Sequence, residues 1–176
     1  MNLIIPTRDN CQEVRLWRND CQVSLRTPYG LTTEMQDDFY DNVICNPNNN
    51  HRYWSMYNDD KFVGFGGITY IQWENSIGEI SLIVNNEYRD KGFGGEAVNL
   101  LLDMSFNYLN LKTVFGECYS NNPAKEFWLK ISKKYNAVIV TLPNRKFWEG
   151  RYHDSIYFSI DRDTFKKLNA GTLIDG

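Results

Sequence analysis

The chain of 176 residues is 42% hydrophobic and 23% charged, a composition that excludes intrinsic disorder and fits a single domain over residues 1–176. Its formal net charge of −3 comes from 19 basic and 22 acidic residues. Because these charges alternate along the chain instead of forming basic blocks, we expect no nucleic-acid partner.

The N-terminal part of the chain has the pattern of two helices. Apolar residues share one side of a predicted helix over residues 9–26, which is interrupted near Asn19 and Asp20. A second helix is expected to start at Thr33, because Thr32 offers a hydroxyl cap and a glutamine follows shortly after. Its apolar stripe would consist of Met35, Phe39 and Val43.

From residue 51 the pattern changes to alternation of polar residues with β-branched and aromatic ones. Strands are predicted over residues 52–57, 61–73 and 77–84. Turn-forming residues separate them at positions 58–60 and 74–76. These three segments therefore predict an antiparallel meander.

The rest of the chain alternates helices and strands. A helix is predicted over residues 94–110, with Val98, Leu101, Leu102, Phe106 and Leu109 on one face. A strand over residues 113–119 follows, then a helix from Pro123 to Lys134 and strands over residues 137–142 and 155–160. The order indicates an α+β fold around a mixed sheet.

The sequence shows no sign of export or of a metal site. The N-terminus lacks a basic segment followed by an apolar stretch, and no apolar run approaches the roughly 20 residues of a membrane span. The cysteines are widely spaced, so we expect reduced thiols, no zinc site, no membrane association and a cytoplasmic location.

A glycine-rich turn over residues 88–97 joins a strand to the longest helix. Helix N-termini carry free N–H groups and a positive dipole end, which favour an anion. A nucleotide P-loop is excluded because Lys91 precedes its glycine. Residues 92–97 satisfy the dinucleotide motif G-x-G-x-x-A, but the series of βαβ units that this motif requires is missing. A tight turn without a ligand is the remaining structural alternative.

Arg89-Asp90-Lys91-Gly92-Phe93-Gly94 resembles the [Q/R]-x-x-G-x-[G/A] signature of the GNAT superfamily of N-acetyltransferases. Three further segments resemble its RimJ/RimL and spermidine acetyltransferase branch: Ile77-Gly78-Glu79, Asn121-Asn122-Pro123-Ala124 and Gly150-Arg151-Tyr152-His153-Asp154. The resemblance covers most of residues 8–160. It implies a GNAT fold with a mixed sheet of about six to seven strands and helices on its flanks.

The resemblance also implies acetyl-CoA as co-substrate. The amides of the glycine turn would hold the pyrophosphate, and a backbone amide of Ile83 or Val84, at a bulge in the fourth strand, would bind the acetyl carbonyl. The implied cofactor-binding residues are Leu82, Ile83, Val84, Arg89, Asp90, Lys91, Gly92, Phe93, Gly94, Gly95, Asn121 and Ala124.

Catalytic candidates follow from alternation and from the resemblance together. Alternation over residues 77–84 places Glu79 on the less apolar face, and the family has a glutamate there that deprotonates or orients the amine. Family members have a tyrosine general acid where this chain has Trp128, and an indole does not give up a proton as a phenol does. Tyr119 or Tyr135 would then substitute, or the thiolate would leave unprotonated.

The acceptor is less defined by the sequence. Trp17-Arg18-Asn19 resembles a run in RimJ/RimL proteins and nucleotide-amino-sugar N-acetyltransferases, which makes Arg18 and Asn19 candidate acceptor-binding residues. An amino sugar, a polyamine and a protein N-terminus all stay open as acceptors, and a homodimer is possible. The alternative is a catalytically degenerate GNAT domain that senses acyl-CoA or serves as an interaction module. No histidine pairs with Cys118 in the sequence, which disfavours a covalent route.

Overall fold

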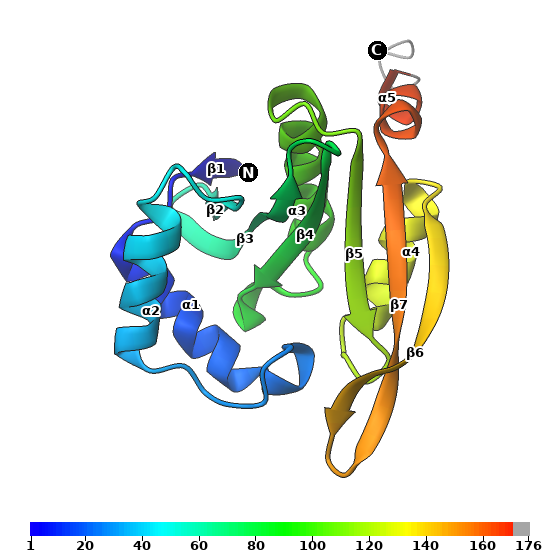
Figure 1. The fold of residues 1–176 in the computed structure, drawn as a ribbon. Helices are drawn as coiled ribbons and strands as arrows, with labels where there is room; N and C mark the ends of the chain where they lie inside the picture. Colours follow the sequence, from blue (N-terminus) through cyan, green and yellow to red (C-terminus); the bar gives the residue numbers. More distant parts are fainter. Residues whose placement is uncertain (171–176) are drawn as a thin grey trace.

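Seven strands form one mixed β-sheet, and helices lie against both of its faces (Figure 1). The computed structural model describes residues 1–170. The strands are β1 (Asn2–Ile4), β2 (Arg52–Asn58), β3 (Lys61–Gln72), β4 (Ile77–Val84), β5 (Thr113–Tyr119), β6 (Val138–Trp148) and β7 (Arg151–Asp161). The helices are α1 (Arg8–Asp20), α2 (Thr33–Phe39), α3 (Phe93–Asp103), α4 (Lys125–Lys134) and α5 (Arg162–Ala170). Short 3-10 or π-helical turns follow α1, α2, β4 and α3 at Gln22–Ser24, Tyr40–Ile44, Asn86–Tyr88 and Met104–Tyr108.

The strand order in the sheet is β1-β2-β3-β4-β5-β7-β6, and β4 runs parallel to β5 while the other neighbours are antiparallel. β2, β3 and β4 form the predicted meander. The connection from β4 to β5 passes through α3, since parallel strands need a crossover of this kind. The α+β mixed sheet is thus confirmed, at the upper end of the expected strand number.

The two parallel strands pair over a short length. Residues 77–79 of β4 are in register with residues 113–115 of β5. Beyond this point, β4 continues to Val84 and β5 to Tyr119, and the described chain shows no further pairing between them. The sheet therefore opens between β4 and β5, and the backbone groups that face this opening have no partner strand.

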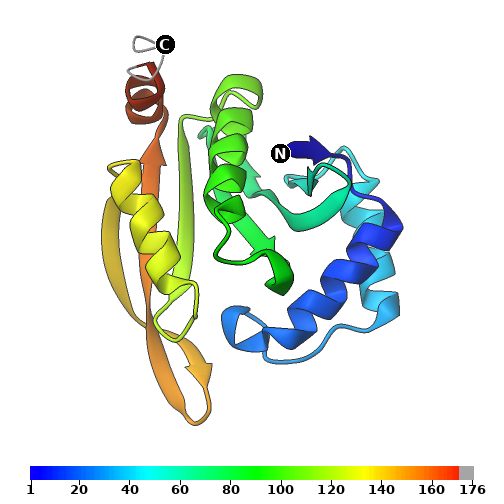
Figure 2. The same cartoon turned by 180° about the vertical axis from the view of Figure 1, so that it is seen from behind.

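Two hydrophobic cores hold the layers together. α3 and α4 cover one face of the sheet (Figure 2), while α1 and α2 cover the other face (Figure 1). The predicted apolar face of α3 is confirmed, because Val98, Leu101 and Leu102 are fully buried. The second core consists of Cys11, Val14, Phe62 and Phe65, with Trp17 and Phe39 packed against it.

Hydroxyl caps set the starts of the first two helices. Thr7 accepts a hydrogen bond from the amide of Asn10, and the Asn10 side chain accepts one from the Thr7 amide. Thr32 accepts from the amide of Met35, which confirms the predicted cap of α2. Within residues 1–170, no helix combines the length and apolar character needed to cross a membrane.

Several predicted boundaries differ from the structure. The first helix ends at Asp20, at the predicted interruption, and does not continue to residue 26. β1 and α5 were not expected, nor was the extension of β6 and β7 over residues 143–148 and 151–154. β1 has three residues and is ordered by its pairing with β2, a contact that has no local sequence signal. In α2, Met35 is 48% exposed while Gln36 is buried, so the predicted apolar stripe is wrong at this position.

Candidate active site

The opening between β4 and β5 exposes the backbone of β4. The amide of Asn85 donates to the carbonyl of Val63 on β3. Since successive residues of a strand direct their N–H groups to opposite edges, the amide of Ile83 also faces β3, and those of Leu82 and Val84 face the opening. The expected bulge is not in this stretch, because β4 stays in register with β3 from Glu79 to Val84. The opening arises where the parallel pairing ends.

The glycine turn leads from β4 into α3 through two residues with left-handed backbone, Asp90 (φ 59) and Gly92 (φ 88). Gly92 is the N-cap of α3, and a side chain there would be strained. The amides of Phe93 and Gly94 belong to the first turn of the helix, and the described chain gives neither of them a backbone acceptor. This arrangement provides free N–H groups for an anion.

Basic side chains flank this turn. Arg89 is exposed and its Nε donates to the carbonyl of Val84 at 3.3 Å, which ties the turn to the end of β4. Lys91 is also exposed, with its ammonium 5.5 Å from the ring centre of Tyr88. Two cations and the positive end of the α3 dipole therefore lie close together, as a pyrophosphate would require.

Glu79 lies at the point where β4 and β5 separate, on the face of the sheet that α1 covers. Its carboxylate is buried and accepts a hydrogen bond from Arg26, which is 53 residues away in the sequence. Burial alone would lower the pKa of Arg26, but the hydrogen bond and the charge of Glu79 outweigh this effect and raise it. The pair joins the segment after α1 to the centre of the sheet.

Glu117 on β5 is a second carboxylate on this face, with a side chain that is 9% exposed. It accepts hydrogen bonds from Arg145 at 2.9 Å and from Ser155 at 2.6 Å, and Arg26 lies 3.8 Å from its other oxygen. Burial alone would raise the pKa of Glu117, but the bonds from Arg145 and Ser155 lower it below its ordinary value. Arg26 thus spans the carboxylates of β4 and β5.

The tyrosine candidates lie in different places. Tyr119, at the end of β5, shares a face with Glu117 and interacts with Arg26. Burial raises the pKa of Tyr119, and the positive charge of Arg26 partly opposes this shift. Tyr135 is buried behind the other face, where its hydroxyl donates to Asn99 at 3.0 Å.

Trp128 packs against the core rather than beside Glu79. Its ring stacks on Phe158 of β7, with ring centres 5.2 Å apart and an angle of 25° between the planes. Phe158 is paired with Gly116, so it lies on the face of the sheet opposite to Glu117. The indole is therefore held by aromatic packing on the α4 side.

Lys146 anchors the segment that carries Arg26. Its ammonium donates to the carbonyls of Val23 at 2.5 Å and Leu25 at 2.7 Å, and it lies over the ring of Tyr119. Lys146 is buried, and this burial lowers its pKa. Because the backbone just before Arg26 is fixed in this way, the guanidinium is directed to the carboxylates.

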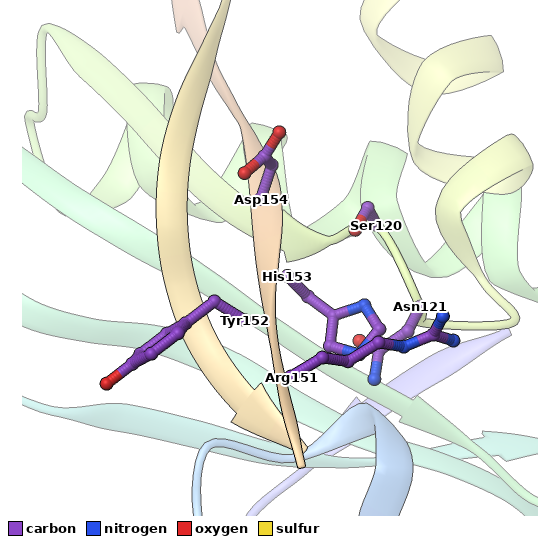
Figure 3. A pocket seen from close by; sticks show the side chains of 6 residues that line it. All are labelled: Ser120, Asn121, Arg151, Tyr152, His153 and Asp154. Atoms are coloured by element: carbon purple, nitrogen blue, oxygen red, sulfur yellow. The ribbon is translucent and has the colours of Figure 1, made fainter. Parts of the chain in front are cut away.

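A cavity of about 340 Å³ lies where β5 ends beside the β6–β7 hairpin. Figure 3 shows Asn121 and His153 on the same side of β7, while Tyr152 points to the other side. Both side-chain atoms of the Asn121 amide and Nε2 of His153 are buried without a hydrogen-bond partner. Such groups are costly unless a ligand or water satisfies them, so Asn121 and His153 have hydrogen-bonding capacity that a ligand can meet.

The acceptor candidates on α1 differ in their surroundings. The Asn19 amide is engaged in both directions, donating to the carbonyl of Leu31 at 3.0 Å and accepting from its amide at 2.7 Å. Arg18 is half-buried and forms no ion pair within residues 1–170. Arg18 therefore keeps a free charge, whereas Asn19 holds the loop before α2.

Comparisons with known proteins identify the fold that carries this site. The sequence profile of the family described as "Acetyltransferase (GNAT) domain" matches residues 3–127, well over half of the chain. The chain belongs to the GNAT acetyltransferase family. A comparison with curated proteins found no match.

Solved structures of Vibrio cholerae spermidine N-acetyltransferases have the same fold. The enzyme in complex with CoA and spermine has a TM-score of 0.83 at 20% identity, over 94% of this chain and 97% of that chain. Mutant forms of the spermidine/spermine N-acetyltransferase SpeG reach 0.82 at 19% identity, over 96% and 97%. A dodecameric structure in an intermediate state reaches 0.79 at 20% identity, over 93% and 95%.

GNAT acetyltransferases use acetyl-CoA, and the residues of this chain fit it. The free amides of Phe93 and Gly94 can receive the pyrophosphate, and a Cβ added at Gly92 or Gly95 would meet no atom within 4 Å. The unpartnered amide of Asn121 can bond to the amide-containing arm of the coenzyme. The structure thus places the glycine turn after the end of β4 and Asn121 after the end of β5, the two strands that flank the opening.

Sequence reasoning missed four charged residues of the site, Arg26, Glu117, Arg145 and Lys146. Glu117 had a usable signal, because it is a carboxylate between the buried Gly116 and Cys118 of β5, just as Glu79 is a carboxylate within the apolar β4. The basic residues had no such signal, since each is separated from its carboxylate or carbonyl partner by 28 residues or more in the sequence. Their roles depend on how the sheet brings distant segments together.

Proposed function

We propose that this acetyltransferase transfers the acetyl group of acetyl-CoA directly to a primary amine bound beside Glu79. The observation that carries the proposal is the buried Glu79 carboxylate at the point where β4 and β5 separate. An alkyl-ammonium has a pKa near about 10.4, so an amine acceptor is mostly protonated at neutral pH. A carboxylate next to it can orient the ammonium and accept its proton.

The proposed roles of the other residues follow from their positions. The first amides of α3, with Arg89 and Lys91, hold the pyrophosphate, and Asn121 holds the arm that leads to the reacting end. The amides of Leu82 and Val84 face the opening, where they can donate to the acetyl carbonyl. Bound acetyl-CoA supplies an activated thioester, and the chain supplies binding, orientation and proton handling.

We propose Tyr119 as the proton donor of the site. Its pKa is raised, so the phenol stays protonated at neutral pH, and it lies on the face that carries Glu79 and Glu117. Trp128 is held on the opposite face by Phe158 and serves packing. The tyrosine that family members carry in the helix after the fifth strand would thus be replaced by one on the strand itself.

A covalent acetyl-enzyme on Cys118 is disfavoured. The thiol is buried, and this burial raises its pKa to about 11, so the nucleophilic thiolate is scarce at neutral pH. Its sulfur lies 3.7 Å from the carbonyl of Tyr119, to which it donates. Intact-mass analysis after incubation with acetyl-CoA alone is expected to show no acetylated protein, and an acetyl adduct on Cys118 would overturn direct transfer.

The acceptor class is tested by CoA release. The structural neighbours are named for spermidine and spermine, so polyamines join amino sugars and peptides with free N-termini in the panel. Release stimulated by one class, with the N-acetylated product identified by mass spectrometry, would support the proposal. Tight acetyl-CoA binding without release from any amine would favour the degenerate acyl-CoA sensor instead.

Self-association and location complete the proposal. β6 is an edge strand, and Val138, Ile139 and Val140 on it are exposed. We propose that two copies pair along this edge, because an apolar strand edge favours pairing with another strand. If this is wrong, sedimentation of the protein in solution would show a monomer.

The proposed location is the cytoplasm. The cysteines are all free, which suits this reducing compartment.

A further inference from the structure

Arg26 covers the two carboxylates of the site, Glu79 and Glu117. Its side chain is 49% exposed, whereas those of Glu79 and Glu117 are 10% and 9% exposed. It donates to Glu79, lies 3.8 Å from Glu117 and interacts with Tyr119. A guanidinium is always charged and does not act as a base. An ammonium that binds Glu79 therefore competes with the guanidinium of Arg26.

The charges around this position do not favour a polycation. The two carboxylates are matched by the contacts of Arg26 and Arg145, and the buried ammonium of Lys146 lies over the Tyr119 ring beside them. Three cations thus accompany two carboxylates. A polyamine would bring several positive charges to a site with no negative charge in excess, and like charges held close together cost binding energy.

A further cation without a partner lies on the same side. Arg18 is half-buried on α1 and has no ion pair among residues 1–170. Burial raises the pKa of Tyr53 to about 12, and the charges of Arg18 and Arg26 both oppose this shift while that of Glu79 adds to it. Arg18 thus belongs to α1, the helix that covers the face of the sheet on which Glu79 and Arg26 lie.

We propose that the acceptor carries a carboxylate or a phosphate close to its reacting amine. The ammonium takes the place of Arg26 on Glu79, and the released guanidinium, with Arg18, binds the anion. Arginine suits this exchange because its planar fork binds a carboxylate or a phosphate through two parallel hydrogen bonds. No charged group is then left buried without a partner. The inference rests on the proposed function and narrows its acceptor.

Matched pairs of amines test the inference in CoA-release assays. Lysine and cadaverine differ in a carboxylate, and phosphoethanolamine and ethanolamine differ in a phosphate. We expect kcat/KM to be about tenfold to 100-fold higher for the anionic member of one pair, since a charge-assisted hydrogen bond contributes about 1.5–3 kcal/mol. The pair that shows the preference identifies the anion.

Variants assign the preference to Arg26. Arg26→Met should lower the ratio of kcat/KM within the preferred pair by about tenfold, because methionine offers no donor to the anion and only Arg18 is left to bind it. Arg8→Met is the matched control, as Arg8 pairs with Asp37 and Asp41 on α2 and its neighbouring turn, and it should keep the ratio. Equal loss for both members of a pair in Arg26→Met would show a structural role and overturn the inference.

Binding separates this inference from the proposed function. Calorimetric titration of each amine into the CoA-bound protein compares the members of a pair without turnover. Tighter binding of the amine-only members, or of spermidine over all anionic probes, would overturn the anion site while leaving acetyl transfer intact. Loss of acetyl-CoA binding altogether, with no release from any amine, would instead overturn the proposed function.

Discussion

Arg26 and Glu79 form an ion pair across the opening of the sheet, although 53 residues separate them in the sequence. Lys146 fixes the backbone before Arg26 through the carbonyls of Val23 and Leu25. The loop after α1 is therefore part of the candidate active site and not merely a connection to α2. The chemistry that Glu79 can perform depends on where this loop holds its guanidinium.

Gly92→Ala should weaken acetyl-CoA binding by about tenfold or more. Gly92 has a φ of 88, and an alanine in the left-handed region costs about 1–2 kcal/mol, which the turn would relieve by shifting its amides. Gly150 has a φ of 79 at the β6–β7 turn and is equally uncrowded. Gly150→Ala should lower thermal stability as much as Gly92→Ala does, but its calorimetric affinity for acetyl-CoA should stay at the wild-type value. Equal affinities of the two variants would contradict the proposed pyrophosphate site.

Trp128→Phe should keep CoA release near the wild-type rate, because a phenyl ring preserves the stacking on Phe158. Trp128→Ala should lower the free energy of unfolding by about 3 kcal/mol through loss of that packing. A Trp128→Phe variant that folds normally but has lost turnover would assign the indole a catalytic role.

Tyr119→Phe should lower kcat for amine-stimulated CoA release by about tenfold or more, since it removes the phenol from the site.

Glu117→Gln should make stability less dependent on pH in acid. The folded pKa of Glu117 lies below its ordinary value of 4.5, so its carboxylate stabilises the fold above this pH and loses that contribution as the pH falls. At pH 7 the free energy of unfolding of the variant should be about 2 kcal/mol lower than that of the wild type. The difference should shrink below about pH 4.5 in denaturant titrations. Glu74→Gln, in the exposed β3–β4 turn, is the control that should change neither value.

The local parts of the fold were predictable, and the long-range parts were not. Strands β2 to β5 and helix α3 have strong periodicity, so their positions follow from the sequence. β1 has three residues and depends on β2 for its order, while the extension of β6 and β7 beyond the predicted strands depends on their pairing with each other. Periodicity reports on burial of a face and carries no information about such partners.

The same limit applies to the site. The glycine turn is continuous in sequence, so its amides and cations could be located together. Glu79 was identifiable as a polar residue within an apolar strand, yet its partner Arg26 lies in a loop that was predicted to continue the first helix. Arg18 and Asn19 are adjacent in sequence and were predicted together. The Asn19 side chain is hydrogen-bonded to the backbone of Leu31, whereas Arg18 forms no ion pair within residues 1–170.

The most direct test of the account compares the wild type with Glu79→Gln in amine-stimulated CoA release and in acetyl-CoA binding by calorimetry. The account predicts that kcat/KM falls by about 100-fold or more, because the amide cannot accept the proton of the amine, while the affinity for acetyl-CoA stays unchanged. Full turnover in a folded Glu79→Gln variant would contradict the proposed site.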